Sequence, residues 1–451
     1  MRAYDLKPTH DNLIQTLTED TIDRNQDISH FVSILNAVED GCAIALDGRW
    51  GSGKTFFIKQ AKMVLEAYNP NIQSMPPEER QRIQDIFSKF SKEETDLIPQ
   101  VCVYYDAWEN DNDDDPVLSL VYTILSSVKS DFTFKNTSCI NIATSILEFF
   151  TGKNWGQIIS SFKSDNPLDV IGHSKNIEEL VKEFLDSLLP ERGNRLVIFI
   201  DELDRCKPSY AVRLLERMKH YFTNERITFV FSVNIAELQH TVKKHYGNDF
   251  DGSRYLDRFF DLRVALPPAN IQKFYWSMDF NDSHYTFDIV CSAVIKAYHF
   301  ELREIAKYIR LTRMAAAAPT HDNRHLIGGS LQFALFYIIP IMIGLKISDI
   351  QRYDRFVSGQ DYTPLLEVSD ALRFAFFGDL LNRNETFDET DDGKTVVTLE
   401  DKLRDVYIAI FGNVDFQSND YTQIGNLTFN HGMKEKLLRT DGLFSSYTSI
   451  T

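Results

Sequence analysis

Gly48-Arg49-Trp50-Gly51-Ser52-Gly53-Lys54-Thr55 is the stretch that decides the fold of this chain. It matches the pattern G-x-x-x-x-G-K-[ST] at every defined position. The apolar run 42–46 before it has the length of a buried strand, and residues 56–65 after it have a helical pattern. A strand, a glycine-rich turn and a helix in this order predict a P-loop.

The residue types of this P-loop suit a nucleoside triphosphate with magnesium. Glycines allow backbone N–H groups to curl around phosphates, and the helix N-terminus faces them with the positive end of its dipole. We expect Lys54 to reach the β and γ oxygens as a catalytic group, and Thr55 to ligate Mg²⁺. The expected binding residues are Gly48, Trp50, Gly51, Ser52, Gly53, Lys54, Thr55 and Phe56.

A second motif ends in two carboxylates: Leu196-Val197-Ile198-Phe199-Ile200-Asp201-Glu202. At the tip of a buried strand, Asp201 can hold the magnesium through water, and Glu202 can polarise the attacking water. The alternative is a pair of solvated carboxylates at a strand end. We expect Asp201 to be a metal residue and Glu202 to be catalytic, which indicates a hydrolase.

Asn234 follows the apolar run 227–233, where a neighbouring strand places a γ-phosphate sensor. The alternative is an Asn that caps the helix starting near Ala236. We predict a catalytic sensor role for Asn234.

Three arginines precede or lie within the last strand, namely Arg254, Arg258 and Arg263. One of them could reach the nucleotide of a neighbouring subunit and stabilise transition-state charge, and Arg258 is the first candidate. The alternative is an ion pair with an acidic neighbour, such as Asp257 or Asp261.

Short apolar runs separated by helical patterns predict a parallel, doubly wound α/β sheet. The runs are 42–46, 101–105, 196–200, 227–233 and 262–266, and Pro267-Pro268 ends the last one. Residues 1–268 form the expected nucleotide-binding domain, with a helical insertion at about 112–191. Residues 269–451 form an expected C-terminal helical domain that acts as a lid or binds other subunits or partners.

Composition describes an ordered globular chain with an acidic balance. Its 451 residues are 43% hydrophobic and carry a net charge of −17, which disfavours nucleic acid and anionic lipid as partners. The five cysteines show no metal-ligand spacing, and no secretory signal is visible at the N-terminus. These features predict a cytoplasmic protein.

One uncharged stretch, residues 326–345, has the length of a membrane span. It contains Gly328, Gly329, Ser330, Gln332 and Pro340, which weaken its apolarity and its continuity as a helix. We expect a buried pair of helices here, with membrane insertion as the minor alternative.

The motifs together resemble the KAP family of P-loop NTPases, which carry an extra strand and a catalytic glutamate. The strongest matches are Asp47 followed by the P-loop with its unusual Trp50, and Ile200-Asp201-Glu202-Leu203-Asp204-Arg205-Cys206. Looser matches are Tyr105-Asp106-Ala107-Trp108, Tyr255-Leu256-Asp257-Arg258-Phe259 and Leu302-Arg303-Glu304-Ile305. The resemblance covers residues 11–268 and, beyond them, only the segment at Arg303.

This resemblance implies a sheet of strand order 5-1-4-3-2, ATP and Mg²⁺ as ligands, and a helical lid in which Arg303 is a second candidate phosphate sensor. Many family members carry membrane helices between the two motifs, and this chain departs from that pattern. Soluble bacterial members occur in defence clusters against phages or plasmids. That role is therefore an expectation at the level of the family.

Similar families use the segment at residues 21–27 to cover the adenine. Arg24 could stack on the base, or it could form a surface ion pair with Asp23 or Asp27. A guanine-specific N-K-x-D sequence is absent, which favours adenine.

The leading hypothesis is an ATPase that assembles into a homo-oligomer and gates a protein effector. A regulatory scaffold with incidental hydrolysis, a nucleic-acid motor and a P-loop kinase are the alternatives. Glu202→Gln separates the first two, because it should stop hydrolysis while binding survives.

Overall fold

The computed structural model describes the chain in segments. The described residues are 7–91, 96–113, 115–131, 183–184, 186–189, 192–221, 224–278, 286–317, 329–374, 376–387, 394–412, 421–430 and 432–442. Within them the chain divides into two compact units: the first is Lys7–Asn270, and the second begins at Ile271.

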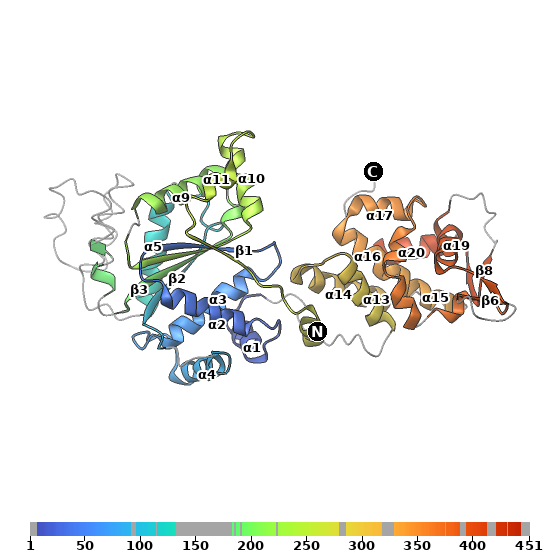
Figure 1. The fold of residues 1–451 in the computed structure, drawn as a ribbon, viewed down its shortest axis with the longest axis horizontal. Helices are drawn as coiled ribbons and strands as arrows, with labels where there is room; N and C mark the ends of the chain where they lie inside the picture. The colour runs from blue at the N-terminus through green and yellow to red at the C-terminus, as the bar shows by residue number, and fades with distance from the viewer. Residues whose placement is uncertain are drawn as a thin grey trace. The chain divides into compact units, whose positions relative to one another are not determined.

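A five-stranded parallel sheet of order β2-β3-β4-β1-β5 forms the centre of the first unit (Figure 1). The strands are β1 (Cys42–Asp47), β2 (Gln100–Asp106), β3 (Arg195–Asp201), β4 (Ile227–Val233) and β5 (Leu262–Ala265). The predicted fold class, the strand order 5-1-4-3-2 and the five predicted strands are confirmed.

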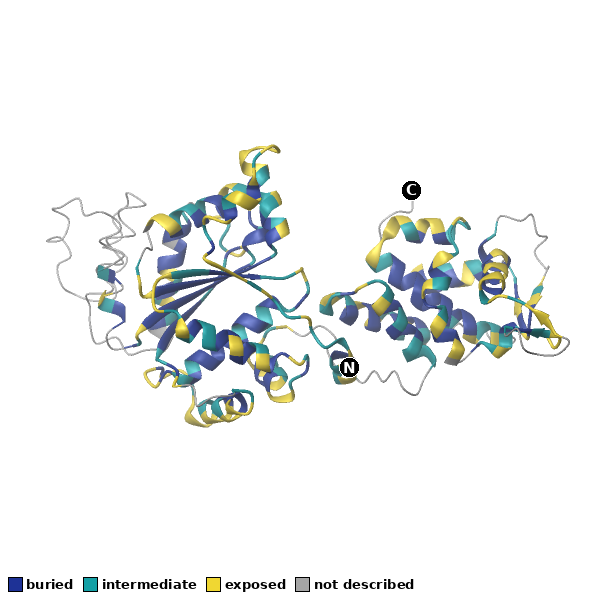
Figure 2. Cartoon of the chain, viewed as in Figure 1, coloured by how far each residue is buried: buried dark blue, intermediate teal, exposed yellow. Residues whose placement is uncertain are grey.

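Helices cover both faces of this sheet (Figure 1). One face packs against α1 (His10–Glu19), α2 (Asn25–Ala37), α3 (Lys54–Tyr68) and α4 (Pro77–Ser88). The other packs against α5 (Pro116–Asp131), α9 (Pro208–Tyr221), α10 (Ile235–Tyr246) and α11 (Gly252–Leu256). Every residue of β3 and β4 is buried (Figure 2), because helices cover both faces of these strands, and their sequences are accordingly mostly apolar.

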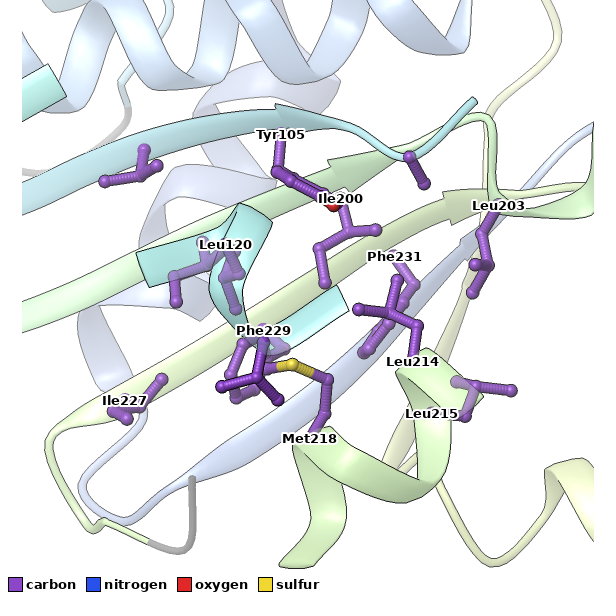
Figure 3. Packing of buried hydrophobic residues seen from close by; sticks show 14 of the residues in the cluster. Tyr105, Leu120, Ile200, Leu203, Leu214, Leu215, Met218, Ile227, Phe229 and Phe231 are labelled. Carbon is purple, nitrogen blue, oxygen red and sulfur yellow. The ribbon is translucent and has the colours of Figure 1, made fainter. Parts of the chain in front are cut away.

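The core between the sheet and α9 contains large apolar side chains (Figure 3). Phe231 lies 5.3 Å from Phe260, ring centroid to ring centroid, and Met218 of α9 packs into the same cluster. On β2, neighbouring tyrosines face opposite sides, as side chains on a strand must. Tyr105 enters this core, and its hydroxyl bonds Tyr210, whereas Tyr104 lies on the face of α3.

The second unit is mainly helical, as predicted for the C-terminal region. Its helices include α12 (Ile271–Ser277), α13 (Thr286–Ala297), α14 (Leu302–Ala317), α16 (Ile339–Ser348), α17 (Ile350–Val357), α18 (Thr363–Glu367), α19 (Leu399–Phe411) and α20 (Gly432–Gly442). Two small sheets accompany them, β6 (Glu385–Thr386) with β7 (Thr395–Val396) and β8 (Thr422–Ile424) with β9 (Leu427–Phe429).

The apolar stretch near residue 340 forms one helix, so the prediction of a helix pair is wrong. α15 (Gly329–Phe333), the π-helical turn η5 (Ala334–Ile338) and α16 run on without a break. Pro340 sits in the first turn of α16, where the π-helical turn before it accommodates a residue that lacks an N–H donor. Among the described residues, Gly329–Ser348 alone is long and apolar enough to cross a membrane, and 61% of its apolar window is buried inside the structure.

Most of the predicted insertion at 112–191 lies outside the described residues. The first helix described within it is α5, which packs against β2 and α9 and therefore belongs to the core of the sheet domain.

Candidate functional site

The P-loop, residues 48–55, joins the end of β1 to the start of α3. Gly51 and Gly53 have positive φ angles of 82° and 92°, a conformation that glycine adopts without steric cost. A side-chain carbon at Gly48 would lie 3.0 Å from Ser52 Oγ and 3.1 Å from Leu266 Cβ. The glycines are therefore required by the backbone path and by the close approach of the segment after β5.

Lys54 is 9% exposed and bonded within the P-loop. Its Nζ donates to the backbone oxygen of Gly48 at 2.5 Å and to that of Arg49 at 3.1 Å. Burial lowers the pKa of Lys54, while the nearby carboxylates of Asp204 and Asp201 act in the opposite direction. The ammonium group is thus held beside the backbone that would surround a phosphate.

The two motifs meet at Thr55 and Asp201. Thr55 Oγ1 donates to Asp201 Oδ2 at 2.7 Å, and the hydroxyl of Tyr104 donates to the same oxygen at 3.1 Å. A hydroxyl and a buried carboxylate at the edge of a phosphate loop are oxygen ligands of the kind that Mg²⁺ takes together with nucleotide phosphates. Thr55 and Asp201 therefore fit the predicted magnesium site.

Glu202 follows Asp201 in a left-handed backbone conformation, with φ 59° and ψ 23°. Such a conformation is uncommon for a residue other than glycine. Its carboxylate accepts from Arg205 Nε, with 2.6 Å between Nε and Oε2. Burial and the charge of Asp201 raise the pKa of Glu202 to about 7, although Arg205 lowers it. A carboxylate with this pKa is suited to accept a proton near neutral pH.

Trp50 connects the P-loop to the second motif. Its Nε1 donates to Asp204 Oδ2 at 2.5 Å. The Arg205 guanidinium lies 5.8 Å from the ring of Trp50 and 5.6 Å from that of Trp108, which follows β2. Burial raises the pKa of Asp204. The unusual tryptophan therefore ties the P-loop to the residues that also hold Glu202.

This geometry agrees with a comparison of sequence families. The sequence profile described as the KAP family P-loop domain matches residues 24–276, more than half of the chain. The chain belongs to the KAP family.

Other similarities are more limited. This KAP-family chain is 36% identical over 70 residues to the uncharacterized protein MJ0182 of Methanocaldococcus jannaschii. The matched stretch is 15% of the chain and about a third, 36%, of the length of that protein. The structure of the Aeropyrum pernix ORC2 protein in ADPNP and ADP complexes is 13% identical, with a TM-score of 0.31 over 79% of this chain and 86% of that one.

Asn234 of this KAP-family chain caps α10. Its Oδ1 accepts from the backbone N–H of Glu237 at 3.4 Å, which is the alternative weighed for this residue. The bond uses the amide oxygen, whereas a phosphate sensor would donate from the amide nitrogen. The sensor role of Asn234 stays a prediction.

Arg24 has different partners from those expected. It is 3% exposed, and its guanidinium donates to the backbone oxygens of Ser52 at 2.8 Å and Pro267. In this conformation the guanidinium is buried against backbone carbonyls and does not lie at the surface. Arg24 therefore contacts the P-loop through the backbone oxygen of Ser52. Stacking of Arg24 on adenine stays a prediction.

Arg258 precedes β5, so it lies at the end of the sheet opposite the P-loop, whereas Arg263 lies within β5. Arg258 is exposed beside a cavity of about 380 Å³ that Gly41 and Cys42, before and within the start of β1, also line. A role for Arg258 at the nucleotide of a neighbouring subunit stays a prediction. Arg263 forms an ion pair with Asp257, as the alternative proposed.

Two other candidate arginines are exposed. Arg254 is an exposed residue of α11. Arg303 is an exposed residue of α14 in the second unit. A role for either in phosphate sensing or in a neighbouring subunit stays a prediction.

From the sequence, no role was assigned to two groups at this site. Tyr104 reaches Asp201, and Asp47 Oδ1 accepts from Ile235 N at 2.9 Å, linking the P-loop strand to α10. The alternation of side chains along β2 could have indicated this position, because Tyr104 and Tyr105 must face opposite sides of the sheet and one of them must face α3.

Proposed function

We propose that this chain binds ATP with Mg²⁺ and hydrolyses it. The observation that carries the proposal is the 2.7 Å bond between Thr55 Oγ1 and Asp201 Oδ2, with Glu202 next in the chain. This bond brings the phosphate loop next to the second motif at the carboxyl ends of the parallel strands. Thr55 and Asp201 are the candidate metal ligands there, and Glu202 is the candidate base. Binders that do not hydrolyse have no need of the second carboxylate.

The residues have distinct tasks. The backbone N–H groups of the P-loop bind the phosphates, and Lys54 exchanges its carbonyl partners for phosphate oxygens. Thr55 and Asp201 would hold Mg²⁺, which neutralises phosphate charge when bound. Glu202 accepts a proton from the attacking water, for which its carboxylate must be ionised and released from Arg205.

Replacement of two residues tests this assignment. Glu202→Gln removes the base, so the rate of phosphate release should fall by about 10²- to 10⁴-fold, while ATP binding, measured by calorimetry, persists. Lys54→Ala should abolish both. The matched control is Glu400→Gln, because Glu400 is an exposed residue of α19 in the second unit. An unchanged rate in Glu202→Gln would remove Glu202 from the mechanism.

A regulatory scaffold that switches on binding alone is the second candidate. The ion pair between Glu202 and Arg205 favours it, because a base held by an arginine supports only slow turnover. Glu202→Gln distinguishes the two functions. A scaffold should keep its ATP-dependent change in particle mass or partner binding, whereas a hydrolysis-driven switch should remain in its ATP-bound state.

The wider role that we propose is an ATP-driven assembly or conformational switch that gates a protein partner. Self-assembly would let Arg258 act on the nucleotide of a neighbouring copy, since it lies at the far edge of its own sheet. The particle mass with ATP and Mg²⁺ tests assembly, and a mass of one chain under all conditions would refute it.

The family resemblance extends the proposal to defence against phages. Bacteria carrying the chain with its neighbouring genes should resist infection in plaque assays, and Lys54→Ala should remove the resistance. Equal plaque numbers with both versions would refute this role.

A further inference from the structure

Arg24 precedes α2, and it is buried where the P-loop meets the segment that leaves the first unit. Arg24 is 3% exposed, and its guanidinium donates to two backbone oxygens, those of Ser52 at 2.8 Å and Pro267. Burying a charged group is costly unless it is well bonded. The two carbonyls are therefore structural partners of Arg24, and both are held by it.

The bond to Ser52 fixes the direction of one peptide group. In a planar trans peptide, the C=O of Ser52 and the N–H of Gly53 point to opposite sides. With the C=O turned to Arg24, the N–H of Gly53 points away from the arginine, immediately before α3 begins at Lys54. Backbone N–H groups at this place in a P-loop are those that bind phosphate.

The loop has a second restraint at the same residue. Ser52 Oγ donates to the backbone oxygen of Arg49 at 2.7 Å, which is a bond within the turn. The bond from Arg24 to Ser52 O restrains the same turn from a distant part of the chain. Gly53, with its positive φ, is the flexible point between Ser52 and the helix. Loss of Arg24 would leave the orientation of the Ser52–Gly53 peptide to this flexible point.

The bond to Pro267 connects the same guanidinium to the exit segment, residues 266–270. Leu266 N donates to Asp47 O at 2.7 Å, and Asn270 N donates to Ile22 O at 2.9 Å. The exit segment is thus fastened to the strand before the P-loop and to the residues before Arg24. After Asn270 the chain enters the second unit.

We propose that Arg24 is a positioning residue that orients the Ser52–Gly53 peptide for phosphate and couples phosphate binding to the exit segment. This inference rests on the proposed nucleotide binding. Arg24 is then part of the phosphate-binding loop region, and the conformation of the exit segment depends on whether phosphate is bound.

Binding of Mg²⁺ with pyrophosphate, and of Mg²⁺ with ATP, tests the positioning role by calorimetry. Pyrophosphate probes the cradle without a base. Arg24→Ala should weaken both ligands by about tenfold or more, and Arg24→Lys, which keeps the charge but lacks the forked donor, should lie between Arg24→Ala and the wild type. Wild-type affinity for pyrophosphate in Arg24→Ala would overturn the positioning role.

Arg195 supplies the matched control. It is also a buried arginine that donates to backbone oxygens, those of Asp40 at 2.8 Å and Glu39 at 2.5 Å, at the opposite edge of the sheet. Arg195→Lys should lower the unfolding temperature as Arg24→Lys does, but leave both affinities unchanged. Equal losses of affinity in the two lysine variants would show a general effect of stability and overturn the proposal.

Hydrogen exchange of residues 269–271 tests the coupling. In the wild type, saturating ATP should slow exchange of these amides, and in Arg24→Lys at saturating ATP the slowing should disappear. Retained slowing in Arg24→Lys would overturn the coupling. If the wild type binds neither ligand, the proposed function itself fails, which is distinguishable from a loss confined to the Arg24 variants.

Discussion

The pH dependence of hydrolysis follows from the environment of Glu202. Burial and Asp201 raise its pKa from 4.5 to about 7, against the lowering effect of Arg205. A base must be ionised, so kcat/KM should rise with pH through this value, since that ratio reports groups of the free enzyme. The ionised fraction changes from about one in eleven at pH 6 to ten in eleven at pH 8, which is a roughly tenfold rise in kcat/KM.

Arg205 sets the midpoint of this rise. Removal of its charge in Arg205→Ala should move the midpoint to higher pH, because the ion pair favours the ionised carboxylate. Arg205→Lys keeps the charge, and its midpoint should stay closer to that of the wild type. The direction in which the midpoint moves is the informative result, because lost packing would lower the rate at every pH without moving the midpoint.

The assay is phosphate release from ATP at saturating Mg²⁺ between pH 5.5 and about 9, a range that spans the pKa on both sides. Glu202→Gln, measured in parallel, shows any titration that belongs to the nucleotide or to other groups. A flat profile in the wild type, or a midpoint that moves to lower pH in Arg205→Ala, would refute this account of Glu202.

Other predictions concern the metal site and the two units. Tyr104→Phe removes the hydroxyl that donates to Asp201 at 3.1 Å, so half-maximal hydrolysis should require about tenfold more Mg²⁺. An unchanged Mg²⁺ titration would show that the hydroxyl has no part in metal binding. Phe231→Ala and Phe356→Ala each remove a fully buried ring, 2% and 0% exposed, and each should cost about 3–5 kcal/mol of stability. In urea unfolding, the first should shift the transition of the nucleotide-binding unit and the second that of the helical unit. A single transition shifted equally by both would contradict separate units.

The sheet was predictable because its strands are buried on both faces. The run predicted at 227–233 has the bounds of β4, and that at 196–200 lies within β3. Such strands are near-continuous apolar runs, and polar residues such as Asp201 and Asn234 mark where they end. The meeting of Thr55 with Asp201 also follows, since the carboxyl ends of parallel strands share one edge.

The position of Arg258 follows from the same rule. Arg258 precedes β5, and residues before a parallel strand lie at the opposite edge from residues that follow one. The P-loop follows β1, so Arg258 and the P-loop lie at opposite ends of these parallel strands.

The partners of Arg24 could not be predicted from the sequence. Ser52 and Pro267 contribute backbone oxygens, which are the same in every residue type and leave no trace in composition or spacing. The helix near Pro340 was mispredicted for a related reason, because the π-helical turn that precedes it is a backbone adjustment with no residue signature.

The carbonyl bonds of Lys54 bear on which ligands the P-loop selects. Gly48 and Arg49 already supply oxygens to the ammonium group, so any ligand competes with the protein's own backbone for it. The affinity for a ligand is then the difference between two sets of hydrogen bonds. A single phosphate would replace those bonds and should gain little beyond them. We expect a polyphosphate to engage the loop N–H groups as well, so the P-loop should favour ligands with more phosphates.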